Sequence, residues 1–175
     1  MSENKTTLEN TLSSKFDESS IESSIKIYQC IITRISGLSF SETLNALDEF
    51  NVTKFRVYTT SKLNEKTIDN YYNNKSNPKK NYVVQICLGL HFPYIISKII
   101  IENAGYALSN SIRDVYYSTA LQRAQFYEFD IDFENDIISK LNQNINNKKE
   151  RIPKFKNYFE IIESKTKKTK ERRHE

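Results

Sequence analysis

The chain contains few of the residues that interrupt helices. Its 175 residues include only three glycines and three prolines. Since Gly and Pro are the strongest local breakers of regular structure, their scarcity predicts an all-helical chain with polar connections. No apolar run approaches the roughly 20 residues of a membrane-spanning helix, so we expect no membrane partner and a soluble protein. This length allows one domain with its own core, or a small domain with tails.

Cysteine and histidine are equally scarce, with two of each. Cys30 and Cys87 lie among apolar residues at helical spacing, which predicts two buried free thiols. Without a disulfide-dense pattern or a secretory signal, the sequence indicates a reducing cytoplasm. His91 follows Cys87 by four residues, but one His-Cys pair falls short of the roughly three or four ligands of a metal site. We therefore expect no metal and read His91 as structural.

Motifs that would indicate catalysis are also missing. The sequence has no glycine-rich phosphate loop, no His-Glu-x-x-His helix and no serine elbow. The acidic run from Glu128 to Asp136 spans a loop and a helix start, where acids cap the helix and complement its dipole. It lacks the glycine of a calcium loop. We therefore expect neither an enzyme nor a cofactor.

Charge is spread unevenly along the chain. The formal net charge is +4, but Lys148 to Glu175 contains eleven Lys/Arg and five Asp/Glu, which leaves a net −2 for residues 1–147. A basic tail on a nearly neutral body suits attraction to phosphate, attraction to a membrane surface, or plain solubility. Charge alone does not choose among these.

Composition and periodicity divide the chain into four segments. They are a flexible N-terminal segment (1–20), an amphipathic helix (21–37), a helical domain with a C-terminal extension (38–147), and a basic helix with a charged tail (148–175). The first segment is too polar to repay the entropy of ordering. The first helix of the domain begins at a capping box, Ser39 with Glu42. In the last segment, Phe155 and its apolar neighbours predict a short helix that docks back on the domain.

The middle of the chain carries the clearest functional pattern. We expect a short helix at 54–60, a turn at 61–63, a second helix at 64–73, and two strongly apolar helices at 82–90 and 94–104. Residues 51–60 also suit a strand, and a helix is preferred because the following elements make sense with it. Two short helices joined by a tight turn and backed by apolar helices follow the plan of a helix-turn-helix, whose second helix can lie in a DNA major groove.

The second of these helices is expected to be amphipathic. Leu63, Ile68 and Tyr71 fall on one side of it, while polar residues fall on the other. The loop that follows carries Lys75, Lys79 and Lys80 without an acid, and leads to a helix N-terminus whose free amides favour an anion. These lysines can hold a phosphate strand, although a solvated helix face and an ordinary polar loop fit the same residues.

Three runs resemble the XRE/Cro/C1-type helix-turn-helix proteins of Firmicutes and their phages: TSKLNEKTIDNYYNNKSNP (60–78), VVQICLGLH (83–91) and IENAGY (101–106). The resemblance covers roughly Ser41 to Leu141. It implies an all-α, five-helix, lambda-repressor-like domain, here with an extra N-terminal helix and C-terminal helices. It also implies a DNA-binding, commonly dimeric regulator of a phage, plasmid or defence locus.

The resemblance assigns roles to individual residues. It implies that Val57, Leu63, Ile68 and Tyr71 are the apolar positions of the motif, and that Lys54 contacts a phosphate. The implied base-reading residues are Asn64, Glu65, Lys66, Asp69 and Asn70. The expected partner is therefore double-stranded DNA, with Lys54, Lys75, Lys79 and Lys80 on its phosphates.

This chain departs from the family pattern at four positions. Tyr58 stands where the family has a small alanine, and Lys62 stands at the usual turn glycine, where a positive φ is easiest. Glu65 and Asp69 put two acids on the face that would meet the duplex. A carboxylate can accept from cytosine, but it also repels phosphate.

An interaction protein on the same scaffold is the alternative function. A mobile-element inhibitor or anti-defence protein would use the Ile- and Tyr-rich surfaces and the basic tail against another protein or a nucleoprotein. The helix at 94–104 is apolar on more than one face, which also suits a homodimer through the Ile-rich helices. The acids on the second helix favour this alternative, while the lysine loop favours DNA.

Overall fold

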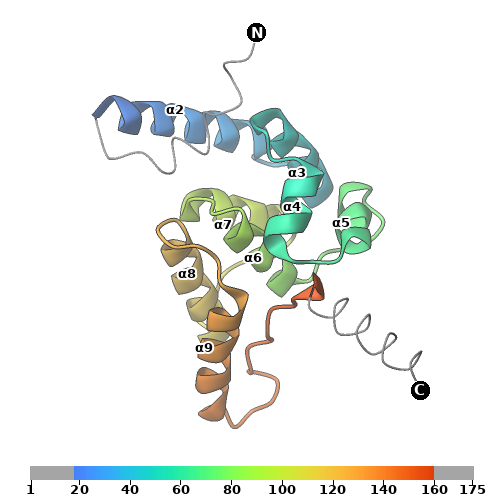
Figure 1. Cartoon of the computed structure of the whole chain (residues 1–175), viewed down its shortest axis with the longest axis vertical. Helices are drawn as coiled ribbons and strands as arrows, with labels where there is room; N and C mark the ends of the chain where they lie inside the picture. The colour runs from blue at the N-terminus through green and yellow to red at the C-terminus, as the bar shows by residue number, and fades with distance from the viewer. Residues whose placement is uncertain (1–17, 160–175) are drawn as a thin grey trace, which may run out of the picture.

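The computed structural model of the chain describes residues 18–159, which form eight α-helices and one short 3-10 helix without a strand (Figure 1). The elements are α2 (Glu18–Ile35), α3 (Phe40–Leu47), η1 (Asp48–Phe50), α4 (Lys54–Ser61), α5 (Glu65–Tyr72), α6 (Lys80–Gly89), α7 (Tyr94–Asn103), α8 (Ile112–Ala124) and α9 (Ile131–Gln143). The all-helical prediction is confirmed for this part of the chain. None of its helices combines the length and the apolar character that crossing a bilayer requires.

Helix α6 is the centre of the fold. All of its residues from Val83 to Gly89 are buried, and it packs against α4, α7 and α8. Helix α2 lies across α3 and α7, α5 lies at the edge beyond α4, and α8 and α9 form a column at the other end (Figure 1). A helix buried on every side needs apolar residues all round, and α6 has them from Val83 to its end except at Gln85. Because α5 packs mainly on α3 and α4, it lies one layer away from α6 and the middle of the core.

The N-terminal predictions need correction. Helix α2 begins at Glu18, so residues 18–20 are helical rather than flexible, and it ends at Ile35 rather than at residue 37. Residues 1–17 lie outside the described part of the chain. The prediction of two buried thiols is wrong for Cys30, which is exposed on α2, and confirmed for Cys87. Burial raises the pKa of the Cys87 thiol to about 12.

Helices α8 and α9 bury fewer apolar side chains than their periodicity predicts. Phe133 and Leu141 share helical spacing with the buried Ile138, a pattern that by itself predicts an inward orientation, but they are 53% and 36% exposed. The buried face of α9 instead includes a carboxylate, Glu134, which accepts from the Tyr116 hydroxyl at 2.6 Å and pairs with Arg123. Periodicity cannot reveal this, because the partners of Glu134 come from α8.

The segment after α9 is extended where a helix was expected. Residues 152–157 have no regular structure, and the chain becomes helical only at Tyr158 and Phe159. Three side-chain amides each accept from a backbone N–H of this segment and donate to one of its carbonyls, at 2.7 to 3.1 Å: Asn142 to Ile152, Asn135 to Phe155, and Gln85 to Lys156. These amides replace the hydrogen bonds that a helix would have supplied. We call residues 152–159 the docked segment.

Candidate nucleic-acid interface

Helices α4 and α5 meet at a tight turn of three residues, Lys62 to Asn64. Each helix has a polar cap, because Thr53 Oγ1 accepts from the Arg56 amide at 3.3 Å and Asn64 Oδ1 accepts from the Lys66 amide at 2.9 Å. Such caps each stabilise a helix by about 1 kcal/mol. The helix boundaries predicted from sequence agree with these caps to within one or two residues.

The apolar positions predicted for this pair of helices are all buried. Val57, Leu63 and Ile68 are fully buried and Tyr71 is 4% exposed. The Tyr71 ring packs edge-on against Phe40 of α3, with centroids 5.7 Å apart, and burial raises its pKa to about 12. Helix α3 also caps the far end of α5, since its polar side chains donate to the carbonyl of the last α5 residue. The inner side of α5 is thus held along its whole length.

The turn is made without glycine. Lys62 has a φ of 58°, a left-handed conformation that costs a non-glycine residue on the order of 1 kcal/mol. The docked segment offsets part of this cost, because the Tyr158 amide donates to the Lys62 carbonyl at 3.1 Å and the Lys62 ammonium lies 5.4 Å from the centre of the Phe159 ring. Lysine at the expected glycine position is therefore compatible with the turn.

Tyr58 does not lie in the close contact expected at the family's alanine position. It is half-buried on the outer side of α4, where its ring packs edge-on against Phe159 with centroids 5.2 Å apart. The close contact is made from α6 instead. An added Cβ at Gly89 would lie 2.6 Å from the carbonyl carbon and oxygen of Thr60. The small residue that lets helices approach is Gly89.

The outer side of α5 is polar and accessible. Glu65 and Lys66 are exposed, Asn64 and Asn70 are half-buried, and within the described chain no ion pair involves Glu65 or Lys66. Asp69 differs, because its Oδ1 lies 2.6 Å from Lys54 Nζ. The structure therefore pairs one proposed base-reading residue with one proposed phosphate-binding residue. Both side chains are more than two-fifths exposed, so the ion pair stabilises the fold by only about 0–1 kcal/mol. Each of the two side chains can therefore leave it for another partner.

The lysines of the loop before α6 separate into two groups. Lys75 and Lys79 are exposed on a loop that the Tyr106 hydroxyl holds by donating to the Pro78 carbonyl at 2.8 Å. Lys80 instead points toward α8, where its ammonium lies 2.6 Å from the Asp114 carboxylate and donates to the Ala107 carbonyl at 2.5 Å. Lys80 is therefore not available to a phosphate beside Lys75 and Lys79.

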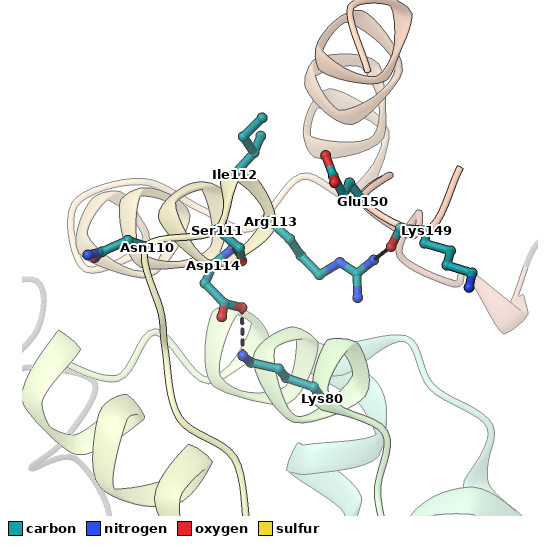
Figure 2. A pocket seen from close by; sticks show the side chains of 8 residues that line it. All are labelled: Lys80, Asn110, Ser111, Ile112, Arg113, Asp114, Lys149 and Glu150. Carbon is teal, nitrogen blue, oxygen red and sulfur yellow. Dashed lines mark hydrogen bonds and ion pairs between the residues drawn. The ribbon is translucent and has the colours of Figure 1, made fainter. Parts of the chain in front are cut away.

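Lys80 borders a cavity of about 540 Å³ at the N-terminus of α8, shown in Figure 2. An anion would find backbone amides and three basic residues here, but an acid of the chain already lies among them. Asp114 occupies the first turn of α8 and pairs with Lys80, and Arg113 donates to the carbonyls of Lys149 and Arg151, each at 2.8 Å. We read this cavity as a structural joint between α6, α8 and the loop after α9.

Two residues of this region were not singled out from sequence. Gln85 is fully buried, and its amide joins the Ser61 carbonyl at 2.6 Å to the backbone of Lys156 at 2.7 and 3.1 Å. The sequence signal that could have identified Gln85 is that it is a single polar residue within an apolar run. Phe55 is 72% exposed near the start of α4, and nothing in its local sequence distinguishes it from a core residue.

His91 is structural in its surroundings. It adopts a φ of 53° at the junction of α6 and α7, and its Nδ1 lies 2.9 Å from the Ala124 carbonyl at the end of α8. Between residues 18 and 159, no group of three or more His, Cys, Asp or Glu side chains is positioned to hold a metal ion.

No protein-family model, curated protein or solved structure matches this chain.

Proposed function

We propose that this chain is a sequence-specific DNA-binding protein, a transcriptional regulator of a phage, plasmid or defence locus, which lays α5 in the major groove. Its fold would be a five-helix helix-turn-helix domain, α3 to α7, with α2 and the C-terminal helices added. One observation carries the proposal. Helix α5 is anchored along one side by buried apolar groups, while its first turn, with Glu65 and Lys66, lies exposed directly after a tight turn. The recognition helix of a helix-turn-helix contacts bases with its N-terminal residues.

The roles follow from exposure and partners. Lys66 and Asn70 read base edges, with Asn64 sharing its amide between the helix cap and the groove, and Glu65 accepts from a cytosine amine. Lys75 and Lys79 hold phosphates beside the helix. Lys54 joins them once Asp69 exchanges its ion pair for a base contact.

Charge on this surface supports a polyanionic partner. Its five lysines, two acids and neutral amides give a net charge of +3; the lysines are Lys54, Lys62, Lys66, Lys75 and Lys79, and the acids are Glu65 and Asp69. Neutralising about three phosphates gives a slope of about −2.7 when the logarithm of the association constant is plotted against that of the salt concentration.

The test is selection of a preferred duplex from a random library by the full chain, followed by affinity measurements on that site and on random DNA. Lys66→Ala should lower affinity for the preferred site by about tenfold, in the range of about 1–3 kcal/mol per good base contact, and affect random DNA less. Lys140→Ala on α9 is the matched control, since Lys140 is also an exposed helical lysine and its helix, α9, lies far from α5 (Figure 1). Equal losses for the two variants would refute the role of α5.

A protein-interaction module is the second candidate, and one surface favours it. Phe55 and Tyr58 of α4 and Phe159 of the docked segment form an aromatic row, with the Phe55 and Tyr58 ring centroids 6.3 Å apart and Phe55 largely exposed. Exposed aromatic side chains are typical of protein interfaces. Under this alternative, Phe55→Ser abolishes capture of a protein partner, and the full chain shows no preference among duplexes.

A further inference from the structure

Helix α8 has a buried side and an exposed side, and both carry apolar residues. The buried side belongs to the core and includes Tyr117 and Leu121. On the other side, five exposed residues recur at alternating steps of three and four, the last of them just after the helix ends: Ile112, Val115, Thr119, Gln122 and Phe126. We call these five residues the outer stripe. Steps of three and four residues are those by which one helix packs lengthwise against another.

The apolar members of the outer stripe are unusually accessible. Ile112, Val115 and Phe126 are each more than half exposed. Figure 2 shows the Ile112 side chain directed away from Lys80 and Asp114, which join α8 to α6. The stripe therefore lies outside the contact between these two helices.

Neighbouring aromatic residues extend the outer stripe. Tyr127 follows Phe126 and is largely exposed, and Phe133 of α9 is more than half exposed. The Arg123 guanidinium of α8 lies 5.4 Å from the centre of the Phe133 ring, which joins the two helices at this surface. For side chains of roughly 150–250 Å² each, the exposed fractions of the five apolar residues leave about 500 Å² in one patch. Single exposed apolar residues are normal, but a contiguous patch of this size is typical of an interaction site.

The area of the patch suits a second copy of the chain. Two such patches placed face to face remove about 1,000 Å² from water, and Thr119 and Gln122 add to this area. The total is then near the roughly 1,200 Å² at which the standard range for stable interfaces begins.

Charge also favours contact between identical patches. The outer stripe contains no charged residue, and Arg123 at its edge is paired with Glu134 of α9. In a two-fold dimer each patch meets itself, so a charged patch would repel its copy. The uncharged stripe is free of this repulsion.

Helix α7 presents much less apolar surface for such a contact. The sequence pattern also allows a homodimer through this Ile-rich helix, but packing has buried most of its isoleucines. Ile96, Ile100 and Ile101 are fully buried, while Ile95 is exposed. A partner copy would find one large accessible side chain on α7 and several on α8.

We propose that this chain forms a homodimer through the outer stripe, with the two α8 helices antiparallel and the two-fold axis at Thr119. Thr119 is the middle residue of the stripe, so Ile112 of each copy packs against Phe126 of the other. Opposed helix dipoles favour the antiparallel arrangement. Helix α5 lies at the other end of the molecule and stays exposed (Figure 1). The inference does not rest on the proposed function; for a dimer that reads DNA with α5, the preferred site is an inverted repeat.

Sedimentation equilibrium of the full chain tests the dimer. Concentrations up to about 100 µM exceed the micromolar dissociation constants found at the weak end for interfaces of standard size. We expect twice the 20.6 kDa of one chain. Val115→Glu should raise the dissociation constant at least about 100-fold, because each dimer would bury two unpaired carboxylates.

Ile95→Glu is the matched control, since Ile95 and Val115 are 51% and 52% exposed and both lie on helices. This control should remain a dimer. Far-ultraviolet circular dichroism checks that both variants keep the helical content of the unaltered chain. A monomer at the highest concentration, or equal weakening by the two substitutions, would overturn the proposal. Because mass is measured without DNA, such a failure leaves the role of α5 to the duplex experiment.

Disulfide cross-linking tests the orientation of the two helices. In a background with Cys30→Ser, which removes the exposed thiol, Thr119→Cys should form a covalent dimer under mild oxidation by diamide. At about 1.5 Å per residue, antiparallel packing about Thr119 separates the two copies of residue 112 by about 21 Å. A disulfide joins Cα atoms roughly 4.4–6.8 Å apart, so Ile112→Cys should form no covalent dimer. Cross-linking through Ile112→Cys, or none through Thr119→Cys, would contradict the proposed packing.

Discussion

Gly89→Ala tests how α4 and α6 are held together. Gly89 is the last residue of α6, and in a helix without close neighbours alanine is more favourable than glycine by about 1 kcal/mol. Here an added Cβ would lie 2.6 Å from the Thr60 carbonyl and 2.8 Å from the Ser61 amide nitrogen. All of these atoms belong to the backbone, so they cannot move aside as the end of a side chain does. The helices would have to separate.

We therefore expect Gly89→Ala to destabilise the protein, although helix propensity alone would make it stabilising. Overpacking of this kind costs about 1–3 kcal/mol beyond the propensity gain, so the free energy of unfolding should fall by about 2 kcal/mol. For a domain of this size, such a loss lowers Tm by about 4–8 °C. The free energy of unfolding is measured by urea titration followed by far-ultraviolet circular dichroism, because the chain has no tryptophan to report unfolding by fluorescence.

Gly105→Ala provides the control. Gly105 has a φ of 81° and no atom within 4 Å of an added Cβ, so its substitution measures the backbone cost alone, about 1 kcal/mol. If Gly89→Ala leaves the chain as stable as before or more stable, the close approach of α6 to the end of α4 is refuted, and with it the support for the turn before α5.

Three further predictions concern charge, acid and thiols. Asp69→Asn should raise affinity for random duplex DNA several-fold, because it removes an acid and frees Lys54, while Tm changes by less than about 2 °C as for other exposed pairs; unchanged affinity would place both residues outside the interface. Burial alone would raise the pKa of Asp114, but hydrogen bonds from Lys80 and from Ser109 lower this pKa below its ordinary value. Its stabilising contribution is therefore present above about pH 4 and is lost as the pH falls through the lowered pKa; Asp114→Asn should flatten this acid-induced loss in urea titrations and lower stability at neutral pH by about 2–4 kcal/mol. A maleimide at pH 7 should label one thiol of the folded chain, the exposed Cys30, and two after unfolding; labelling of both without denaturant would contradict the burial of the second.

Much of the central region could be predicted from sequence, because its determinants are local. Thr53 and Asn64 cap helices whose first turns they adjoin, and the spacing of Ile68 and Tyr71 assigns the inner side of α5 without reference to the rest of the chain. The buried run in α6 likewise follows from its composition. Periodicity failed where partners are distant, as at Phe133 and Leu141.

Only the tertiary structure decided which charges of the candidate interface are available. Lys54 meets Asp69 at a separation of 15 residues, Lys80 meets Asp114, and Gln85 meets Lys156 at a separation of 71 residues. No local pattern encodes such pairs, because they form only after the helices have packed and brought distant side chains within a few ångströms. The sequence by itself determined that there are helices and which sides of α4 and α5 face inward, since hydrogen bonding and hydrophobic burial act over one or two turns. Packing determined which side chains remain free on the outside.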